Sequence, residues 1–466
     1  NNRNHDMEPK RVLLVSQSHP AVDKMLEDLI REDKNKPDIL RIGRDEKLSQ
    51  EIREKYSIGD VKERWINDVK VNCDIYAKSI MKEAGINEEE FEKYYQKLEE
   101  SNTENNELTE KDYEFISAFQ KKTDGIQSGR IRKILEIQKE WKDQVSKCEE
   151  VELYIIKSTI IIAGTCTGFA SNRIIRDVDF DYVIVDEAAK ATFPELAISL
   201  NKAHKIILVG DHQQLPPVLD TELIRDNREK IDEENLMQGI FEKLYEIFPE
   251  DNKHRLTIQY RMHPTIGTLI SHVFYKDDIQ NGVSKEDRTL GIDGYDNIAI
   301  EWIDTSKRSA KERYEKVFEN NGKRSYQNNL EKNIIKQKLI ELDSKLKEKT
   351  KIAIITGYGP QKYILQTMVK QQAFRFLDID VDTVDAFQGS QKDIIIYSTV
   401  RSSSNPYGIG FLKSEARINV AFSRARCLLI IVGDMKFLDN YKIRGNKFPE
   451  IIEYIKSSAE CRIVEY

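Results

Sequence analysis

Two acidic residues directly follow a short, mostly apolar run at residues 180–185, and their type and position suit phosphate chemistry. They are Asp186 and Glu187. A carboxylate at a strand end can hold Mg²⁺, and a second carboxylate beside it can orient and deprotonate a water molecule. We therefore assign metal binding to Asp186 and water activation to Glu187. The alternative interpretation is a strand end that happens to be acidic.

A second polar group follows the next apolar run, residues 205–209. Gly210 and Asp211 lead into a His-Gln-Gln sequence, and the side-chain amide of Gln214 could donate a hydrogen bond to a terminal phosphate. The alternative here is an ordinary turn held by glycine and by the prolines at 216 and 217. The two polar groups together are a more specific signal than either one alone.

Seven short runs rich in β-branched residues predict the strands that carry these groups. They are residues 11–15, 159–163, 182–185, 205–209, 351–355, 393–399 and 427–432. Continuous apolar runs are typical of parallel strands buried on both faces, and the helical stretches between many of them favour doubly wound α/β sheets. Ligands of such sheets bind beyond the carboxyl ends of the strands.

Residues 45–151 differ in character, being rich in Lys, Glu and Asn and poor in strand formers. Helical spacing at 52–56, 61–81, 88–100 and 130–145 predicts a helical, stalk-like insertion. The alternative is a disordered charged linker, but aromatic residues such as Trp65 and Trp141 argue against it. The polar stretch 304–329 predicts a mobile loop.

Composition limits the function classes. The 466 residues suit two or three domains, with 39% hydrophobic and 33% charged residues and a mean hydropathy of -0.58. Apolar runs are too short for a membrane span, and the first residues lack the apolar stretch of a signal peptide. The five scattered cysteines contain no CxxC pair and favour a reducing, cytoplasmic setting, or a nuclear one in a eukaryote.

Several motifs occur in the order that is typical of one helicase family. Residues 210–217 and 259–264 resemble signature runs of superfamily 1 helicases of the Senataxin and nonsense-mediated-decay type. Further matching runs are residues 12–23, 163–171, 325–331, 356–361, 383–393 and 417–426.

This resemblance implies an α/β fold of two RecA-like doubly wound parallel-sheet domains, with a helical insertion in the first. The insertion at 45–151, which composition and helical spacing indicate, lies outside the match; the first domain is then placed at residues 1–44 and 152–256 and the second at 257–466.

The resemblance also implies ATP and Mg²⁺ as cofactors and gives roles to several residues. Arg261 and Arg424 would be arginine fingers, because a planar and permanently charged guanidinium suits charge spread over phosphate oxygens. Gln214 would sense the γ-phosphate, and Gly389 would let the backbone approach it closely. Tyr260 would stack on the adenine, with a core tyrosine as the alternative.

Four hydroxyl residues are expected to hold phosphates of single-stranded RNA or DNA. They are Ser18, Thr165, Thr356 and Thr383, at positions where the family contacts the strand without reading its bases. Each could instead cap a helix, and this alternative is nearly equal for Ser18. The net charge of -7 neither supports nor excludes a nucleic-acid partner, because only the charge of the binding groove matters.

The sequence departs from the family pattern at three places. Lys190 stands where the family has a glutamine, and Gln391 stands where it has a glutamate. The amide of Gln391 can still bond a ribose hydroxyl, but less strongly than a carboxylate would. We assign Gln391 and Asp211 to the nucleotide-binding residues. The phosphate-binding motif G-x-x-x-x-G-K-[ST] does not occur in these residues. We expect that loop and its strand to precede this segment in a longer chain.

These observations predict an ATP-driven helicase or translocase on single-stranded RNA or DNA, with 5′-to-3′ movement implied by the resemblance. Asp186, Glu187, Gln214, Arg261, Gly389 and Arg424 are expected to converge on one cleft. Two alternatives stay open: a nucleic-acid-binding module that does not turn over ATP, and a motor inside a larger defence or repair protein.

Overall fold

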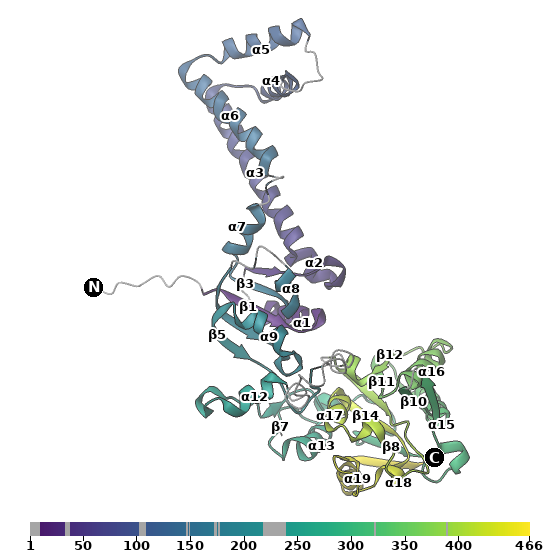
Figure 1. The fold of residues 1–466 in the computed structure, drawn as a ribbon. Helices are drawn as coiled ribbons and strands as arrows, with labels where there is room; N and C mark the ends of the chain where they lie inside the picture. The colour runs from purple at the N-terminus through teal and green to yellow at the C-terminus, as the bar shows by residue number, and fades with distance from the viewer. Residues whose placement is uncertain are drawn as a thin grey trace. The chain divides into compact units, whose positions relative to one another are not determined.

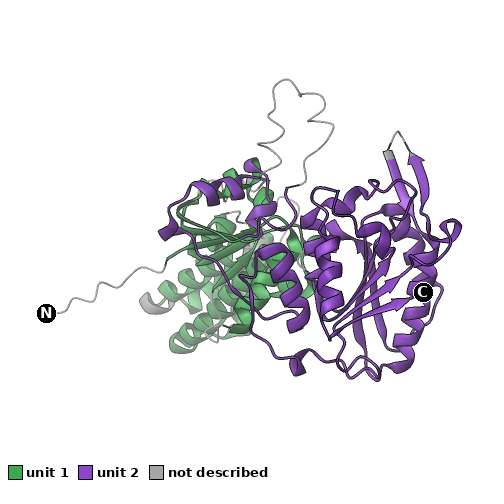
Figure 2. Ribbon diagram, turned by 90° about the horizontal axis from the view of Figure 1, so that it is seen from below, with its two compact units in different colours: residues 1–186, 194–209 green, residues 187–193, 210–466 purple. Residues whose placement is uncertain are grey.

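The computed structural model describes residues 10–32, 38–101, 109–145, 148, 150–171, 175, 178–217, 239–320, 323–387 and 390–466. The chain forms two compact units (Figure 2). Unit 1 comprises residues 1–186 and 194–209, and unit 2 comprises residues 187–193 and 210–466. The predicted domain limits stay predictions.

Unit 1 is built on a five-stranded sheet with the order β2-β3-β1-β4-β5, in which all paired strands are parallel. The strands are β1 (Val12–Ser16), β2 (Ile39–Arg41), β3 (Ile161–Thr165), β4 (Phe180–Val185) and β5 (Ala203–Leu208). Helix α1 (His19–Glu32) packs Val22 and Leu26 against this sheet. Helices α2 (Gln50–Tyr56) and α8 (Cys166–Ser171) contact β2 and β3, respectively, and α9 (Phe193–Leu200) lies between β4 and β5 in the chain.

The edge strand β5 differs from the prediction of burial on both faces. Its consecutive side chains Ile206 and Ile207, which point to opposite faces of the sheet, are 47% and 46% exposed. Within the described residues β5 pairs only with β4. Burial on both faces requires cover above and below the strand, and the described residues do not supply that cover for β5.

Besides α2, five α-helices lie between β2 and β3 in the described residues, and they confirm the interpretation of this stretch as helical. They are α3 (Ile58–Ala84), α4 (Glu88–Ser101), α5 (Glu110–Lys122), α6 (Ile126–Val145) and α7 (Glu150–Ser158). Helices α3 and α6 run side by side, and α4 and α5 lie at the end away from the sheet (Figure 1). Gln138 Nε2 in α6 donates to the carbonyl oxygen of Cys73 in α3 over 2.9 Å.

The far end of this helical stalk has an apolar cluster of its own. Met81, Phe91, Tyr94, Phe119 and Leu135 are buried there. The rings of Tyr94 and Phe119 stack with centroids 4.6 Å apart. Packing of aromatic side chains therefore holds α4 and α5 in place, which a charged linker could not achieve.

Unit 2 is built on a six-stranded sheet with the order β12-β11-β13-β14-β8-β15, again with parallel pairs throughout. The strands are β8 (Ile300–Asp304), β11 (Thr350–Thr356), β12 (Leu377–Thr383), β13 (Lys392–Ser398), β14 (Ala425–Gly433) and β15 (Cys461–Glu465).

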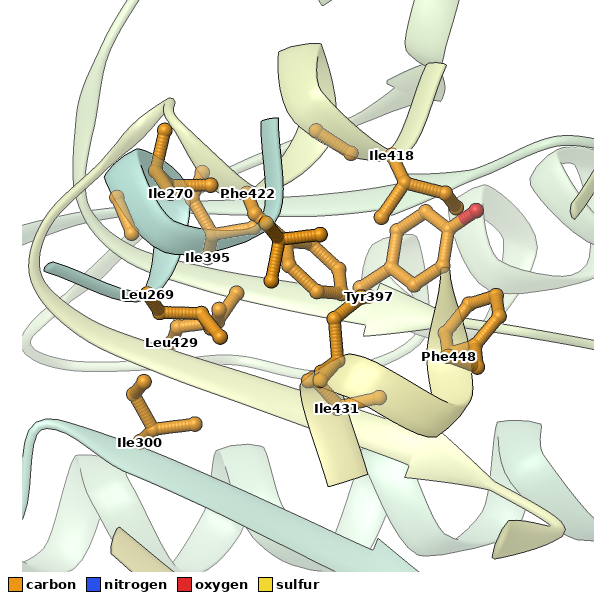
Figure 3. Packing of buried hydrophobic residues seen from close by; sticks show 14 of the residues in the cluster. Leu269, Ile270, Ile300, Ile395, Tyr397, Ile418, Phe422, Leu429, Ile431 and Phe448 are labelled. Atoms are coloured by element: carbon orange, nitrogen blue, oxygen red, sulfur yellow. The ribbon is translucent and has the colours of Figure 1, made fainter. Parts of the chain in front are cut away.

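Both faces of this sheet are covered by helices. On one face, α13 (Pro264–Tyr275), α17 (Glu415–Phe422) and α19 (Phe448–Ser457) pack on Ile395 and Tyr397 (Figure 3). On the other face, α15 (Asn329–Lys345) and α16 (Gly359–Lys370) pack on Ile394 and Ile396. Alternate residues of β13 thus enter two different cores. The predicted fold class, two RecA-like α/β domains with parallel sheets, is confirmed.

The predicted mobile loop at residues 304–329 is wrong. The described part of this stretch contains α14 (Ala310–Arg313) and a hairpin of β9 (Lys316–Asn320) and β10 (Lys323–Gln327), which pair in antiparallel fashion. The hairpin is polar, so composition alone did not distinguish it from a loop. The remaining short elements are η1 (Asp45–Lys47), η3 (Ala188–Lys190), α12 (Ile240–Ile247), η4 (Glu250–Asn252), β6 (Ile258–Gln259), β7 (Gln280–Asn281), η5 (Glu286–Arg288), η6 (Val384–Phe387), η7 (Gly410–Lys413) and α18 (Met435–Leu438).

Among the helices that the structure describes, none combines the length and apolar character needed to cross a membrane.

Candidate nucleotide site

The acidic pair lies where β4 ends. The backbone N–H of Asp186 donates to the carbonyl oxygen of Val15 over 2.8 Å, which places Asp186 at the carboxyl edge of the unit 1 sheet. Glu187 has a φ of 55°, in the left-handed region that non-glycine residues rarely adopt. Such strained backbone is concentrated at functional sites. The turn carries the chain from β4 into η3.

Glycine is required at position 210, the first residue of the second polar group. An ideal Cβ at Gly210 would lie 2.8 Å from the backbone nitrogen of Ala189, so any side chain would collide with the η3 segment. The close approach brings Gly210, Asp211 and Gln214 beside the residues that follow Glu187.

The carboxylate of Asp211 organises this segment. It accepts hydrogen bonds from the backbone N–H of Gln213 over 3.0 Å, from Gln214 Nε2 over 2.8 Å and from the hydroxyl of Tyr275. Because Gln214 Nε2 is used in this way, Gln214 Oε1 is left to face a donor. That donor is Arg424 Nη2, at 3.0 Å.

Arg424 is held at the junction of α17 and β14, with only 2% of its surface exposed. Its Nε donates to the carbonyl oxygen of Val420 over 3.1 Å, and its Nη1 donates to that of Ser390 over 3.4 Å. Burial, together with the charge of Arg261, lowers the pKa of Arg424 to about 10, and the charge of Glu187 acts in the opposite direction. Val420, Ser390, Gln214 and Ser423 thus give this cation oxygens of neutral groups as hydrogen-bond acceptors.

Arg261 comes to the same place from the turn between β6 and α13. Its Nη1 donates to the carbonyl oxygen of Ser423 over 3.2 Å. Burial lowers the pKa of Arg261, while the charge of Glu187 raises it. Burying cations is costly, the charge of Glu187 offsets part of that cost for both arginines, and a bound anion would relieve more of it. The pair of guanidinium groups therefore fits a phosphate.

Two residues of this cluster had not been assigned from the sequence. Asn419 Nδ2 donates to the hydroxyl of Tyr275 over 2.8 Å and to the carbonyl oxygen of Gln213 over 3.0 Å. Burial raises the pKa of Tyr275, which keeps its hydroxyl protonated as a donor to Asp211. Asn419 lies inside the run 417–426 and could have been found there. Nothing in the local sequence marks Tyr275.

Known protein families and relatives match large parts of this chain. Two family models, each described as an AAA domain, match residues 1–222 and 236–436. A regulator of nonsense transcripts 1 homolog from Neurospora crassa is 32% identical over 311 residues, which are 63% of this chain and 26% of that protein. The ATP-dependent helicase NAM7 of Saccharomyces cerevisiae is 32% identical over 300 residues, which are 63% of this chain and 29% of that protein.

The chain belongs to the helicase family of the nonsense-transcript regulators. Another relative, the DNA polymerase alpha-associated DNA helicase A of Saccharomyces cerevisiae, is 32% identical over 66% of this chain and 45% of that protein. The chain spans less than half the length of each of these three relatives. A solved PRRSV helicase covers 59% of this chain and 38% of its own at 16% identity, with a TM-score of 0.30.

Other residues of the helicase-family motifs are placed as follows. Tyr260 is 64% exposed, so the alternative of a core tyrosine is wrong. Gln391 is exposed directly before β13, and Gly389 lies outside the described residues. Lys190, at the position of the family's glutamine, is half-buried, and its burial lowers its pKa, whereas the charges of Glu187 and Asp385 raise it.

The four hydroxyl residues divide into two groups. Ser18 Oγ accepts from the backbone N–H of Ala21 over 3.4 Å, and Thr165 Oγ1 accepts from that of Gly168 over 3.2 Å. Both therefore make the helix-capping contacts that the alternative interpretation gave them. Thr356 is fully buried at the end of β11, and its Oγ1 has no hydrogen-bond partner among the residues that the structure describes. Thr383, half-buried, ends β12.

Proposed function

We propose that this chain is the ATP-hydrolysing motor of a helicase that moves 5′-to-3′ along single-stranded RNA or DNA. The observation that carries the proposal is the cluster of buried Arg424, half-buried Arg261 and Gln214, whose two cations are influenced by the charge of Glu187. A module without ATP turnover would have no need to withdraw two arginines from solvent within the electrostatic influence of a strained acid.

The donor set suits ATP and Mg²⁺. The described residues hold no group of three or more His, Cys, Asp or Glu side chains able to bind a metal ion. Mg²⁺ in nucleotide hydrolases commonly needs only one or two carboxylates, because phosphates and waters supply its other ligands. Asp186 would hold the ion, which neutralises charge on the phosphate oxygens when it is bound.

The residues of the chain would divide the remaining work. Glu187 would orient the attacking water and accept its proton. Arg261 and Arg424 would neutralise the charge that develops on the transferred phosphoryl group. Gln214 would exchange its bond to Arg424 for one to the γ-phosphate. Tyr260, which is exposed, would stack on the adenine, and Gln391 would contact the ribose.

The proposal is tested by Glu187→Gln in the full-length protein. This variant should bind a fluorescent ATP analogue like the parent protein, while its strand-stimulated ATP hydrolysis should fall by about 10²-fold or more, because a positioned base contributes roughly 10²–10⁴-fold. Glu250→Gln is the matched control, since that side chain is 88% exposed. Hydrolysis at the parental rate in Glu187→Gln would remove this residue from its role. A parent protein that hydrolyses no ATP would favour the inert binding module.

A further inference from the structure

An aromatic ring stands exposed at the carboxyl edge of the unit 2 sheet. Phe411, in the short helix η7, has 50% of its surface exposed. Its neighbours Ile409 and Leu412 are each 1% exposed and belong to the unit 2 core. Burial of Ile409 and Leu412 therefore fixes the backbone on both sides of Phe411 and keeps its ring in solvent.

The contacts of Phe411 place it over the end of β11. An ideal Cβ at Gly357, the residue after β11, would lie 3.9 Å from Phe411 Cβ. The ring of Tyr358 has its centroid 5.6 Å from that of Phe411. The guanidinium carbon of Arg417 lies 4.9 Å from the Phe411 centroid, so a cation borders the ring.

Polar groups without partners gather at the same strand ends. Besides Thr356 Oγ1, Nη1 of Arg401 is buried without a hydrogen-bond partner in the described part of the chain, although Nη2 of the same guanidinium lies 3.4 Å from Glu315 Oε1. Arg401 follows β13, and its Nε lies 3.9 Å from an ideal Cβ at Gly410, the residue before Phe411. Buried polar groups are nearly always paired, so those left over indicate a ligand-binding edge.

The backbone at this edge is strained as well. Val400 has a φ of 69°, which is unfavourable for a β-branched residue. The strain is maintained by Glu331, whose carboxylate oxygens both lie 2.9 Å from the N–H of Val400. Strain maintained by a buried network at a strand end is typical of a site that must be preorganised.

We propose that Phe411 stacks on a base of the bound single strand while Arg417 binds an adjacent phosphate. This inference rests on the proposed function, because it requires that the chain binds single-stranded nucleic acid. An aromatic face accepts the face of any base, so stacking holds the strand without selecting a sequence. The arginine adds a charge-dependent contact that weakens with salt. The stacking contribution of Phe411 and the charge-dependent contribution of Arg417 to the binding free energy can therefore be measured separately.

The test compares Phe411→Ala with the parent full-length protein on two strands of equal length. One strand carries bases throughout, and the other has several abasic positions. Removal of one stack should lower the affinity for the first strand by roughly 5–150-fold, since a base–aromatic stack contributes about 1–3 kcal/mol. The affinity for the abasic strand and the salt dependence should hardly change. Phe411→Trp should keep the parental affinity, and Arg417→Gln should reduce the salt dependence.

Tyr363→Ala is the control for loss of an exposed aromatic, because Tyr363 is 70% exposed on α16. If the parent binds neither strand, the proposed function itself fails. If the parent binds and Phe411→Ala behaves like it on both strands, only the stacking inference is overturned. An equal loss of affinity for both strands would also overturn the stacking inference, because the Phe411 ring would then stabilise the protein and not contact a base.

Discussion

Arg424 Nη2 donates to Gln214 Oε1 over 3.0 Å, although the two residues are 210 positions apart in the chain. The bond joins the polar turn after β5 to the turn between α17 and β14. In the proposed motor, Gln214 and Arg424 would both turn to the γ-phosphate. The bond between them would then be broken by ATP and reformed when phosphate leaves, which couples the two motifs to the nucleotide state.

Arg424→Ala should reduce the turnover number for ATP by about 10³-fold or more, because an arginine finger contributes roughly 10³–10⁵-fold. Arg424→Lys should recover little of this loss, since an ammonium group cannot reproduce the planar fork. Steady-state ATPase assays with saturating strand check both values. Arg255→Ala is the matched control, because Arg255 is 46% exposed. A fully active lysine variant would contradict the assigned role.

A second prediction concerns Glu331, which is fully buried and accepts from the hydroxyls of Ser398 and Thr399 over 2.6 and 3.1 Å. Burial raises the pKa of Glu331 from 4.5 to about 8. Below the unfolded pKa both states are protonated. Between these two pKa values only the unfolded state ionises, so stability falls as pH rises, at about 1.4 kcal/mol per pH unit for this group.

Urea unfolding from pH 5 to 8 measures this effect as the difference between the parent and Glu331→Gln. The amide cannot ionise, so the variant should lack the part of the slope due to this group. Glu450→Gln, at a side chain that is 43% exposed, should keep the parental slope. Parallel pH profiles for the parent and Glu331→Gln would show that Glu331 does not titrate in this window.

A third prediction concerns the strand. Binding through phosphate contacts should weaken as salt is raised and should differ little between unrelated sequences of equal length. Titrations of labelled strands at several salt concentrations check this. Sequence-selective affinity that is indifferent to salt would argue against a translocase.

A fourth prediction concerns the far end of the stalk. Phe119 is 4% exposed, and Phe119→Ala should cost about 3–5 kcal/mol in local stability, as is usual for a buried phenylalanine. Because the apolar cluster around Phe119 is separate from the sheet cores, the loss should be confined to α4, α5 and the adjoining turns of α3 and α6.

Hydrogen exchange should therefore rise in those helices while ATP hydrolysis persists. Tyr113→Ala, at a side chain that is 59% exposed on α5, is the control. Equal destabilisation of the sheets would show that the stalk and the motor unfold together.

The strands that are buried on both faces of a sheet were predicted best from the sequence. Strands β11, β13 and β14 are central, so nearly every side chain meets a core and the runs are continuously apolar. Strand β12 was missed because it lies at the edge and alternates Asp378, Asp380 and Asp382 with other residues. Strand β8 was missed because buried Glu301 interrupts its apolar run.

The candidate site was predictable only through the order of its motifs. Local physical reasoning led to Asp186 and Glu187, because a strand end is a local feature. It could not have joined Gln214 to Arg424, since nothing in either neighbourhood encodes a partner so distant. Tyr275 shows the same limit: its hydroxyl completes the Asp211 cluster, yet its position on α13 resembles that of an ordinary core tyrosine.

Among the described residues the outer edge of β5 is unpaired, and this has a practical consequence for work with this chain in isolation. An edge strand offers a row of backbone donors and acceptors that can template the addition of a strand from another molecule. Ile206 and Ile207 would make such an addition favourable on both faces. Within β5, the charged Lys205 and the polar His204 are the residues that oppose it. Self-association at high concentration would therefore begin at this strand, well before the cores of either unit open.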